Sequence, residues 1–406
     1  MKTTATVCAR IVTGLATLAL AALSAPSSAW AGGVVTTCDE THLDAALSGG
    51  GLVTFSCGGA ATITLTSTKT ISANTTIDGG GVITLHNSGS TAFTVNSGIA
   101  FTVENLTLSG TGDGIDSNGG TLTATNCIFT GNSDGISGGS GAVTATGCTF
   151  TGNSDGISGG AGNISVTNCT FANSSDGISG GNGAVTATGC TFTGNSDGIS
   201  GGSGGLTVTN CTFANNTSDG ISGGSGGLTV TNCTFANNGS DGISTGGATT
   251  LTNTILTNSG SANCSGTITD GGHNLDDGTT CGFTGTGCTP TTGTSFCNTN
   301  PDLASGLANN GGPTQTIALL AASPARDAGD NSTCTNAPVS GVDQRGFSRF
   351  PAGDPICDIG AFEFNGSSGP PQGAPAPALA PSGLCMVAAL LGAMGWLKLR
   401  RRESRR

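Results

Sequence analysis

Residues 197–218 read DGISGGSGGLTVTNCTFANNTS, and near copies of this stretch fill residues 112–244. Asp-Gly-Ile returns every 21 or 22 residues, and one Cys and one Phe return with the same period. The Asp residues of this row are Asp113, Asp134, Asp155, Asp176, Asp197, Asp219 and Asp241. A fixed period of this length is typical of a solenoid, in which each repeat buries its apolar face by stacking on its neighbours.

Within one copy, apolar and polar residues alternate as they do in a strand. Leu206 and Val208 are expected to point inward and Thr207 outward. The alternation slips by one at Asn210, which predicts a bend, and a third short strand is expected at residues 219–222. Three short strands and three turns in about 21 residues make one coil of a parallel β-helix. We therefore predict an all-β solenoid.

The composition agrees with this fold. Only 9% of the residues are charged, 72 are Gly and none is Tyr. Gly and β-branched residues are poor helix formers, whereas Val, Thr and Phe favour strands. The strict apolar period argues against disorder. We expect the parallel β-helix to occupy residues 61–262, with regular repeats at 112–244.

The first 31 residues have the features of a secretory signal peptide. Basic residues precede an apolar stretch at residues 11–23, and Ala29-Trp30-Ala31 forms an A-x-A cleavage site. A retained signal anchor is the alternative. Export makes disulfide bonds the default state of cysteine pairs outside the repeats.

The last 41 residues read as a linker and a sorting signal. Residues 366–383 are rich in Pro, Ala and Gly, and residues 384–406 combine a short apolar run with a basic end. The 14 apolar residues at 384–397 are fewer than the roughly 20 of a membrane helix, and the basic end favours a cytoplasmic C-terminus. This tripartite tail resembles the PEP-CTERM-like sorting signals of Gram-negative bacteria, which implies transient membrane contact before processing. The expected location is the cell surface or outer envelope, or the medium after processing.

Both ends of the solenoid should be covered, because an open sheet edge templates aggregation. Residues 32–60 are expected to form an N-terminal cap, with a short helix at 38–47 and a strand at 53–57. Residues 263–365 should hold the last coils and an irregular, disulfide-rich C-terminal cap. Proximity in the sequence predicts the disulfides Cys38–Cys57, Cys264–Cys281, Cys288–Cys297 and Cys334–Cys357.

Four short sequence motifs in the C-terminal part of the chain are distinctive enough to compare with known families. They are NNGGPT at 309–314, SPARDAG at 323–329, DQRG at 343–346 and CDIGAFE at 357–363. They resemble the choice-of-anchor Q family of bacterial surface proteins. The N-terminal stretch at residues 38–81 is similar to that family too. The resemblance implies a right-handed parallel β-helix with a surface location. It implies no defined activity.

Charge excludes some classes of partner. Residues 32–365 hold four basic and 23 acidic residues, so their net charge is near −19. A nucleic-acid partner is therefore excluded. Polysaccharide lyases, which share the β-helix fold, are expected by family resemblance to use a Lys or Arg base near an acidic substrate. No basic residue lies between Lys69 and Arg326.

The Asp row allows three interpretations. Asp can open a turn and bond its own backbone, with Gly supplying the permissive conformation. Alternatively, repulsion between stacked carboxylates could be relieved by weakly bound Ca²⁺. The candidate ligands are Asp134, Asp155, Asp176, Asp197 and Asp219. A third interpretation is catalysis, because Asn-Ser-Asp-Gly resembles part of a polygalacturonase active-site phrase. Such an enzyme needs one acid/base pair in a cleft, whereas this row contains seven equivalent copies, which argues against catalysis.

The Cys and Thr rows have structural explanations as well as functional ones. Six Cys in a line are expected to be buried thiols, because metal ligands must converge on one point. Outward Thr-x-Thr pairs could form a ligand face or, by resemblance to some antifreeze β-solenoids, an ice-binding face. Thr also simply suits exposed strand positions. The candidates are Thr144, Thr146, Thr186, Thr188, Thr207, Thr209, Thr229 and Thr231.

The remaining chemistry-bearing residues are few. His42, His86 and His273 are scattered, and Arg326, Arg345 and Arg349 are expected to pair with nearby Asp residues of the C-terminal cap. We predict a non-catalytic, surface-anchored β-helix used for adhesion, surface binding or structure, with a glycan or another extracellular molecule as ligand. The alternatives are a polysaccharide-acting β-helix enzyme and an ice-binding protein. No cofactor is expected beyond Ca²⁺.

Overall fold

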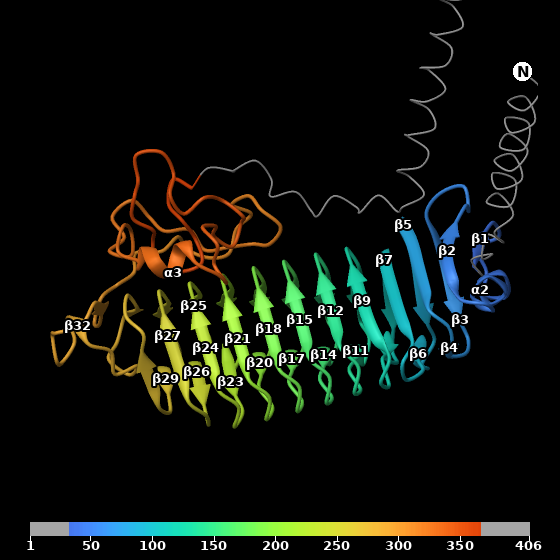
Figure 1. The fold of residues 1–406 in the computed structure, drawn as a ribbon, viewed down its shortest axis with the longest axis horizontal. Helices are drawn as coiled ribbons and strands as arrows, with labels where there is room; N and C mark the ends of the chain where they lie inside the picture. Colours follow the sequence, from blue (N-terminus) through green and yellow to red (C-terminus); the bar gives the residue numbers. More distant parts are fainter. Residues whose placement is uncertain (1–31, 367–406) are drawn as a thin grey trace, which may run out of the picture.

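The computed structural model describes residues 32–366, and these wind into a long parallel β-helix (Figure 1). Each regular coil adds one strand to each of three rows. The first and second rows belong to one 23-stranded sheet, and the third row is a 10-stranded sheet. The predictions of a signal peptide, a linker and a sorting tail concern residues outside the described range, apart from Gly366.

The strands of the three rows follow one another along the chain. The first row is β9 (Thr121–Thr125), β12 (Val143–Thr146), β15 (Ile164–Thr167), β18 (Val185–Thr188), β21 (Leu206–Thr209), β24 (Leu228–Thr231), β27 (Thr249–Thr252) and β30 (Ile268–Asp270). The second row is β10 (Ile128–Thr130), β13 (Thr149–Thr151), β16 (Thr170–Ala172), β19 (Thr191–Thr193), β22 (Thr212–Ala214), β25 (Thr234–Ala236), β28 (Ile255–Thr257) and β31 (Leu275–Asp276). The third row is β4 (Lys69–Ile71), β6 (Phe93–Val95), β8 (Ile115–Asp116), β11 (Asp134–Ser137), β14 (Asp155–Ser158), β17 (Asp176–Ser179), β20 (Asp197–Ser200), β23 (Ile221–Gly223), β26 (Asp241–Thr245) and β29 (Ala262–Ser265).

The coils before residue 111 are less regular. Their strands are β1 (Gly33–Val35), β2 (Gly51–Phe55), β3 (Ala61–Leu65), β5 (Thr75–Asn87) and β7 (Ala100–Gly110). The strands β5 and β7 are long enough to run through both of the first two rows. Two short strands, β32 (Gly285–Thr286) and β33 (Ser295–Phe296), follow the last coil.

The register places equivalent residues directly above one another. Phe171 pairs with Phe192, and Asp176 with Asp197, in parallel ladders. The predicted bend between the first two rows is confirmed, because Asn168 (φ 54°) and Gly189 (φ 67°) adopt the left-handed conformation there. Only Gly and, less readily, Asn adopt this conformation without much strain. This explains why Asn or Gly stands at that position in each coil.

A dry core runs along the solenoid axis. Six Phe rings, from Phe129 to Phe235, stack with neighbouring centroids 4.6–4.9 Å apart and planes within 5° of parallel. The six repeat cysteines are buried and unpaired, as predicted. Five of the six sulfur atoms, all except that of Cys127, accept a backbone N–H group from the coil before, at 3.3–3.4 Å.

The Gly of Asp-Gly-Ile is required by close packing. A Cβ on Gly177 would meet the Gly198 carbonyl and lie 2.9 Å from the Phe192 ring. Buried Asn side chains bridge the coils beside it: Asn195 Nδ2 donates to Phe171 O and Asn216 Oδ1, both at 3.1 Å. Because unpaired buried amides are costly, this row ties each coil to the next.

The helix α2 (Glu40–Leu47) covers the first coils (Figure 1). Asp39 caps it by accepting the His42 N–H, and Leu43 is buried against the core. Lys69 Nζ reaches Glu40 at 2.6 Å and Asp44 at 2.8 Å. The short helix lies within the predicted residues 38–47, and the strand that follows it begins and ends two residues before the predicted 53–57.

The chain after the last coil turns back along the side of the solenoid (Figure 1). We call residues 299–366 the return segment; it contains α3 (Asn331–Thr335). Thr314 Oγ1 donates to Gly189 O at 2.9 Å, and Gly360 N donates to Asn253 O at 2.8 Å. The return segment therefore covers part of the outer surface of the second row as well as the last coils.

Candidate functional site

The Asp row forms a regular ladder of half-buried side chains. Each Asp begins a third-row strand or lies two residues before one, and Asp219 N donates to Asp197 Oδ1 at 2.9 Å. The same bond joins Asp241 N to Asp219 Oδ1 at 2.9 Å. The carboxylates therefore bond the backbone of the next coil, whereas the turn interpretation expected a bond to their own backbone.

This geometry bears on the calcium prediction. Among residues 32–366, no group of three or more acidic, His or Cys side chains is arranged to hold a metal ion. Burial is the main cause that raises the pKa of Asp134 to about 6, and repulsion from the neighbouring carboxylates Asp113 and Asp155 contributes to the same rise. Calcium binding stays a prediction, and an unchanged melting midpoint at roughly millimolar Ca²⁺ would remove it.

The Thr rows are not equally exposed. Thr144, Thr146, Thr186, Thr207 and Thr229 are exposed, and Thr188 is half-buried. Thr209 and Thr231 are only 1% and 8% exposed, so these two cannot belong to an outer ligand face. The return segment therefore interrupts the row formed by Thr146, Thr188, Thr209 and Thr231. A test of ice binding should substitute Thr144 and Thr186 instead.

Polar contacts hold the return segment on the solenoid. Gln344 is central: its Nε2 donates to Thr191 Oγ1 at 2.9 Å and its Oε1 accepts from Thr212 Oγ1 at 2.6 Å. Asn210 Nδ2 donates to Val342 O at 3.0 Å. Because the side chains of Gln344, Thr191 and Thr212 are buried, these bonds fix the orientation of the return segment.

A cavity of about 480 Å³ opens at the N-terminal side of this interface. One wall is the bend between the first two rows, and the other is the return segment. The lining residues are Asn168, Thr188, Gly189, Asn210, Pro313, Pro338, Val339, Ser340, Val342, Asp343, Gln344, Arg345, Gly346 and Phe347. Its size falls within the range of about 300–1,000 Å³ typical of ligand sites.

Both titratable residues of the cavity are held by structural bonds. Asp343 Oδ1 accepts the N–H groups of Arg345 and Phe347, and Asp343 Oδ2 accepts from Arg345 Nε and from Glu363 N. The Arg345 guanidinium lies 3.7 Å from the centroid of the Phe362 ring. Neither side chain has the freedom of a general acid or base.

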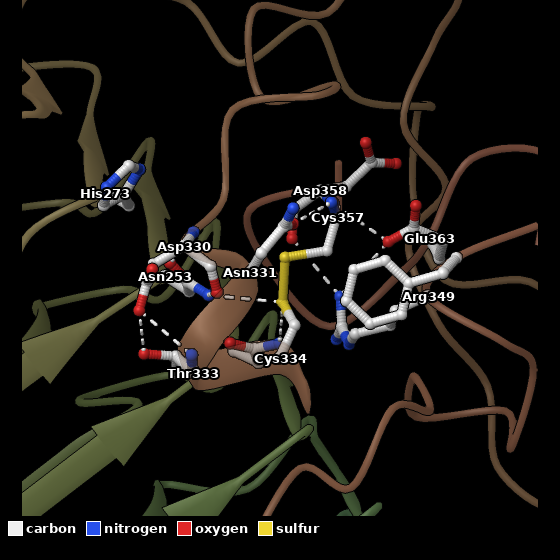
Figure 2. The surroundings of a disulfide bond; sticks show 12 residues. Asn253, His273, Asp330, Asn331, Thr333, Cys334, Arg349, Cys357, Asp358 and Glu363 are labelled. Atoms are coloured by element: carbon white, nitrogen blue, oxygen red, sulfur yellow. Dashed lines mark hydrogen bonds and ion pairs between the residues drawn. A yellow bond between two sulfur atoms is a disulfide. The ribbon is translucent and has the colours of Figure 1, made fainter. Parts of the chain in front are cut away.

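A buried charge cluster lies deeper in the return segment (Figure 2). Arg349 is fully buried, with its NH1 atom 3.5 Å from Glu363 Oε2 and its NH2 atom 2.8 Å from Gly360 O. Burial raises the pKa of Glu363 to about 9 and that of Asp358 to about 6. Arg345 pairs with Asp343 at 2.7 Å, as the sequence predicted, whereas the partner of Arg349 is Glu363 and Arg326 stacks on Phe364.

The cluster makes stability depend on pH. Because the folded protein holds the Glu363 proton more tightly than the unfolded chain, stability should fall as pH rises from about 4.5 to about 9. A pKa difference of one corresponds to about 1.4 kcal/mol. Urea midpoints at pH 5, 7 and 9 measure the slope, and Glu363→Gln should flatten it above pH 7. An equal slope in this variant would assign the effect elsewhere.

The structure contains the four disulfides that the sequence predicted. Cys334–Cys357 joins α3 to the phrase at residues 357–363, beside Asp358 (Figure 2). Asn253 Nδ2 lies 3.4 Å from the Cys334 sulfur. This crosslink therefore fixes the part of the return segment that contacts the solenoid. No helix in the described range is long and apolar enough to cross a membrane.

Sequence reasoning missed the cavity and the buried role of Glu363. Asn168 and Thr188 stand in the repeats, while Pro338 and Phe347 lie more than a hundred residues later. The repeat signal alone gives no reason to join them. The one sequence feature that pointed to this region was the cluster of unrepeated motifs after residue 309.

Comparison with known proteins gives one family match and several distant structural neighbours. Residues 60–204 match the family described as right handed beta helix region. Pectate lyase Pel9A is 17% identical over 77% of this chain and 88% of that chain, with a TM-score of 0.46. The Azotobacter vinelandii mannuronan C-5 epimerase AlgE4 A-module is 14% identical over 61% and 88%, with a TM-score of 0.37.

A GH87 alpha-1,3-glucanase catalytic domain in complex with tetrasaccharides is 13% identical over 62% of this chain and 70% of that chain, with a TM-score of 0.37. No curated protein matches the sequence. The parallel ladders and the family match together identify the fold as a right-handed parallel β-helix.

Proposed function

We propose that this protein is an exported, non-catalytic β-helix that binds a ligand at the cell surface through the cavity beside the return segment. The observation that carries the proposal is the state of the lining residues: Asp343 and Arg345, the two titratable ones, are locked in structural bonds. The neutral groups Asn168, Thr188 and Ser340 make no side-chain hydrogen bond within residues 32–366 and are available to a ligand. Available neutral groups without an available acid/base pair support binding rather than turnover.

The surface location rests on sequence features alone. The signal peptide, the tripartite tail and the choice-of-anchor Q resemblance together support export followed by attachment or release. Fractionation of cells and sequencing of the mature N-terminus test this part. Protein retained in the cytoplasm with an intact N-terminus would contradict it.

The alternative is a polysaccharide-acting enzyme. Incubation of the purified protein with a polysaccharide panel separates the two, because binding without sustained product release is expected. Immobilised protein is then exposed to cell-surface and extracellular preparations to measure retention. Continuous release of oligosaccharides would overturn the non-catalytic proposal.

A further inference from the structure

We propose that the cavity between the second-row bend and the return segment is a site for an uncharged oligosaccharide. This inference rests on the proposed binding function and names the class of its ligand.

The solenoid wall presents polar groups without internal partners. Asn168 is half-buried, and within residues 32–366 only its backbone N–H, not its side-chain amide, is hydrogen-bonded to protein. The Thr188 hydroxyl also has no hydrogen-bond partner within residues 32–366. The same is true of the exposed Ser340 hydroxyl on the other side of the cavity. An amide and two hydroxyls offer both donors and acceptors, which is what the hydroxyl groups of a sugar ring require.

The opposite wall supplies apolar surface. Pro313, Pro338 and Val342 line it, and the half-buried Phe347 ring lies beside them. A sugar ring carries hydroxyls at its edge and C–H groups on its faces. It can therefore bond one wall while packing a face against the other, the combination of apolar lining and few polar groups typical of small-molecule sites.

Charge selects an uncharged ligand. The lining contains one cation, Arg345, whose guanidinium bonds Asp343 Oδ2, Asn310 O and Glu363 O. Its charge is thus neutralised by Asp343. Residues 32–365 together carry a net charge near −19, so their field repels uronic acids and leaves neutral sugars unaffected.

The sequence provides an unusually close internal control. Residues 141–160 and 183–202 are identical, so Thr146 and Thr188 occupy the same position in the same local sequence. Thr188 lines the cavity, whereas Thr146 is exposed and lies outside it. Any difference between substitutions at these two positions must come from the return segment and the site it forms.

The test is a glycan array followed by titration calorimetry on the purified protein. Neutral oligosaccharides should bind, and uronic-acid oligosaccharides of equal length should bind at least tenfold more weakly. Thr188→Trp should weaken the neutral ligand at least tenfold, because the indole fills the cavity, whereas Thr146→Trp should leave the dissociation constant unchanged.

A second variant guards against misfolding. Asn168→Gly keeps the left-handed bend, since Gly already stands there in neighbouring coils, and removes the amide. A loss of about fivefold is expected for one neutral hydrogen bond. Asn126→Gly, at the same bend two coils earlier and outside the cavity, is the control and should bind as the wild type does.

The outcomes separate the two proposals. Retention on surface preparations without glycan binding, preference for uronic acids, or equal effects of Thr188→Trp and Thr146→Trp would overturn the saccharide site and leave surface binding standing. Binding to neither glycans nor surface preparations would overturn both. If only Thr188→Trp and Asn168→Gly lose affinity for neutral oligosaccharides, the result supports both the surface-binding function and the saccharide site.

Discussion

Phe171→Ala is expected to lower the free energy of unfolding by about 3–5 kcal/mol, the usual cost of replacing a buried aromatic ring with a methyl group. The Phe171 ring is fully buried between Phe150, at 4.7 Å, and Phe192, at 4.9 Å. The vacated volume cannot be refilled, because the register of the ladders holds both neighbouring rings in place. Chemical denaturation of the two proteins measures the difference.

The matched control for this variant is Ser165→Ala, an exposed residue of the same coil. Its effect should stay within about 0.5 kcal/mol, as for most surface substitutions. A loss below about 1 kcal/mol in Phe171→Ala would show that neighbouring coils can collapse around the gap, which contradicts a rigid stacked core.

Arg349→Ala is expected to destabilise the return segment by about 3–5 kcal/mol, because it leaves several buried acceptors unsatisfied at about 1–3 kcal/mol each. The guanidinium donates to Asn210 Oδ1 at 3.0 Å, Gly360 O at 2.8 Å and Val342 O at 3.1 Å. Alanine leaves these acceptors and the Glu363 carboxyl without that donor in a region closed to water. Limited proteolysis should cut the return segment early while the solenoid stays intact.

Arg326→Ala is the control, because Arg326 is half-buried, stacks on Phe364 and donates to Ala321 O at 2.6 Å. Its removal should cost no more than about 1 kcal/mol of stability. Arg326 remains partly in contact with water, and a cation–π contact of this kind contributes little net free energy. Equal cleavage of the return segment in wild type and Arg349→Ala would contradict the role assigned to the buried cluster.

Much of the solenoid could be predicted from local sequence. The period of Asp-Gly-Ile, the alternation in residues 206–209 and the slip at Asn210 each report a property of a single coil. Stacking copies the same environment from coil to coil, so local rules suffice. Disulfide pairs were predictable for a similar reason: their partners lie only 9–23 residues apart.

The Asp row shows where local rules stop. The sequence favoured turns, in which Asp bonds its own backbone, but the carboxylate reaches the N–H of the next coil. That partner is 22 residues away and becomes adjacent only when the ladders form. The same limit applies to Glu363, whose pairing with Arg349 depends on the fold of the return segment.

The sequence by itself determined the coil: its three strands, its left-handed bend and its Ile, Phe and Cys interior. Only the tertiary structure decided which outer residues are available. Thr149 and Thr191 lie in identical 20-residue segments, yet Thr149 is half-buried and Thr191 is completely buried. The difference arises because residues 299–366 return to one part of the solenoid and form polar bonds there, which no local pattern in the repeats encodes.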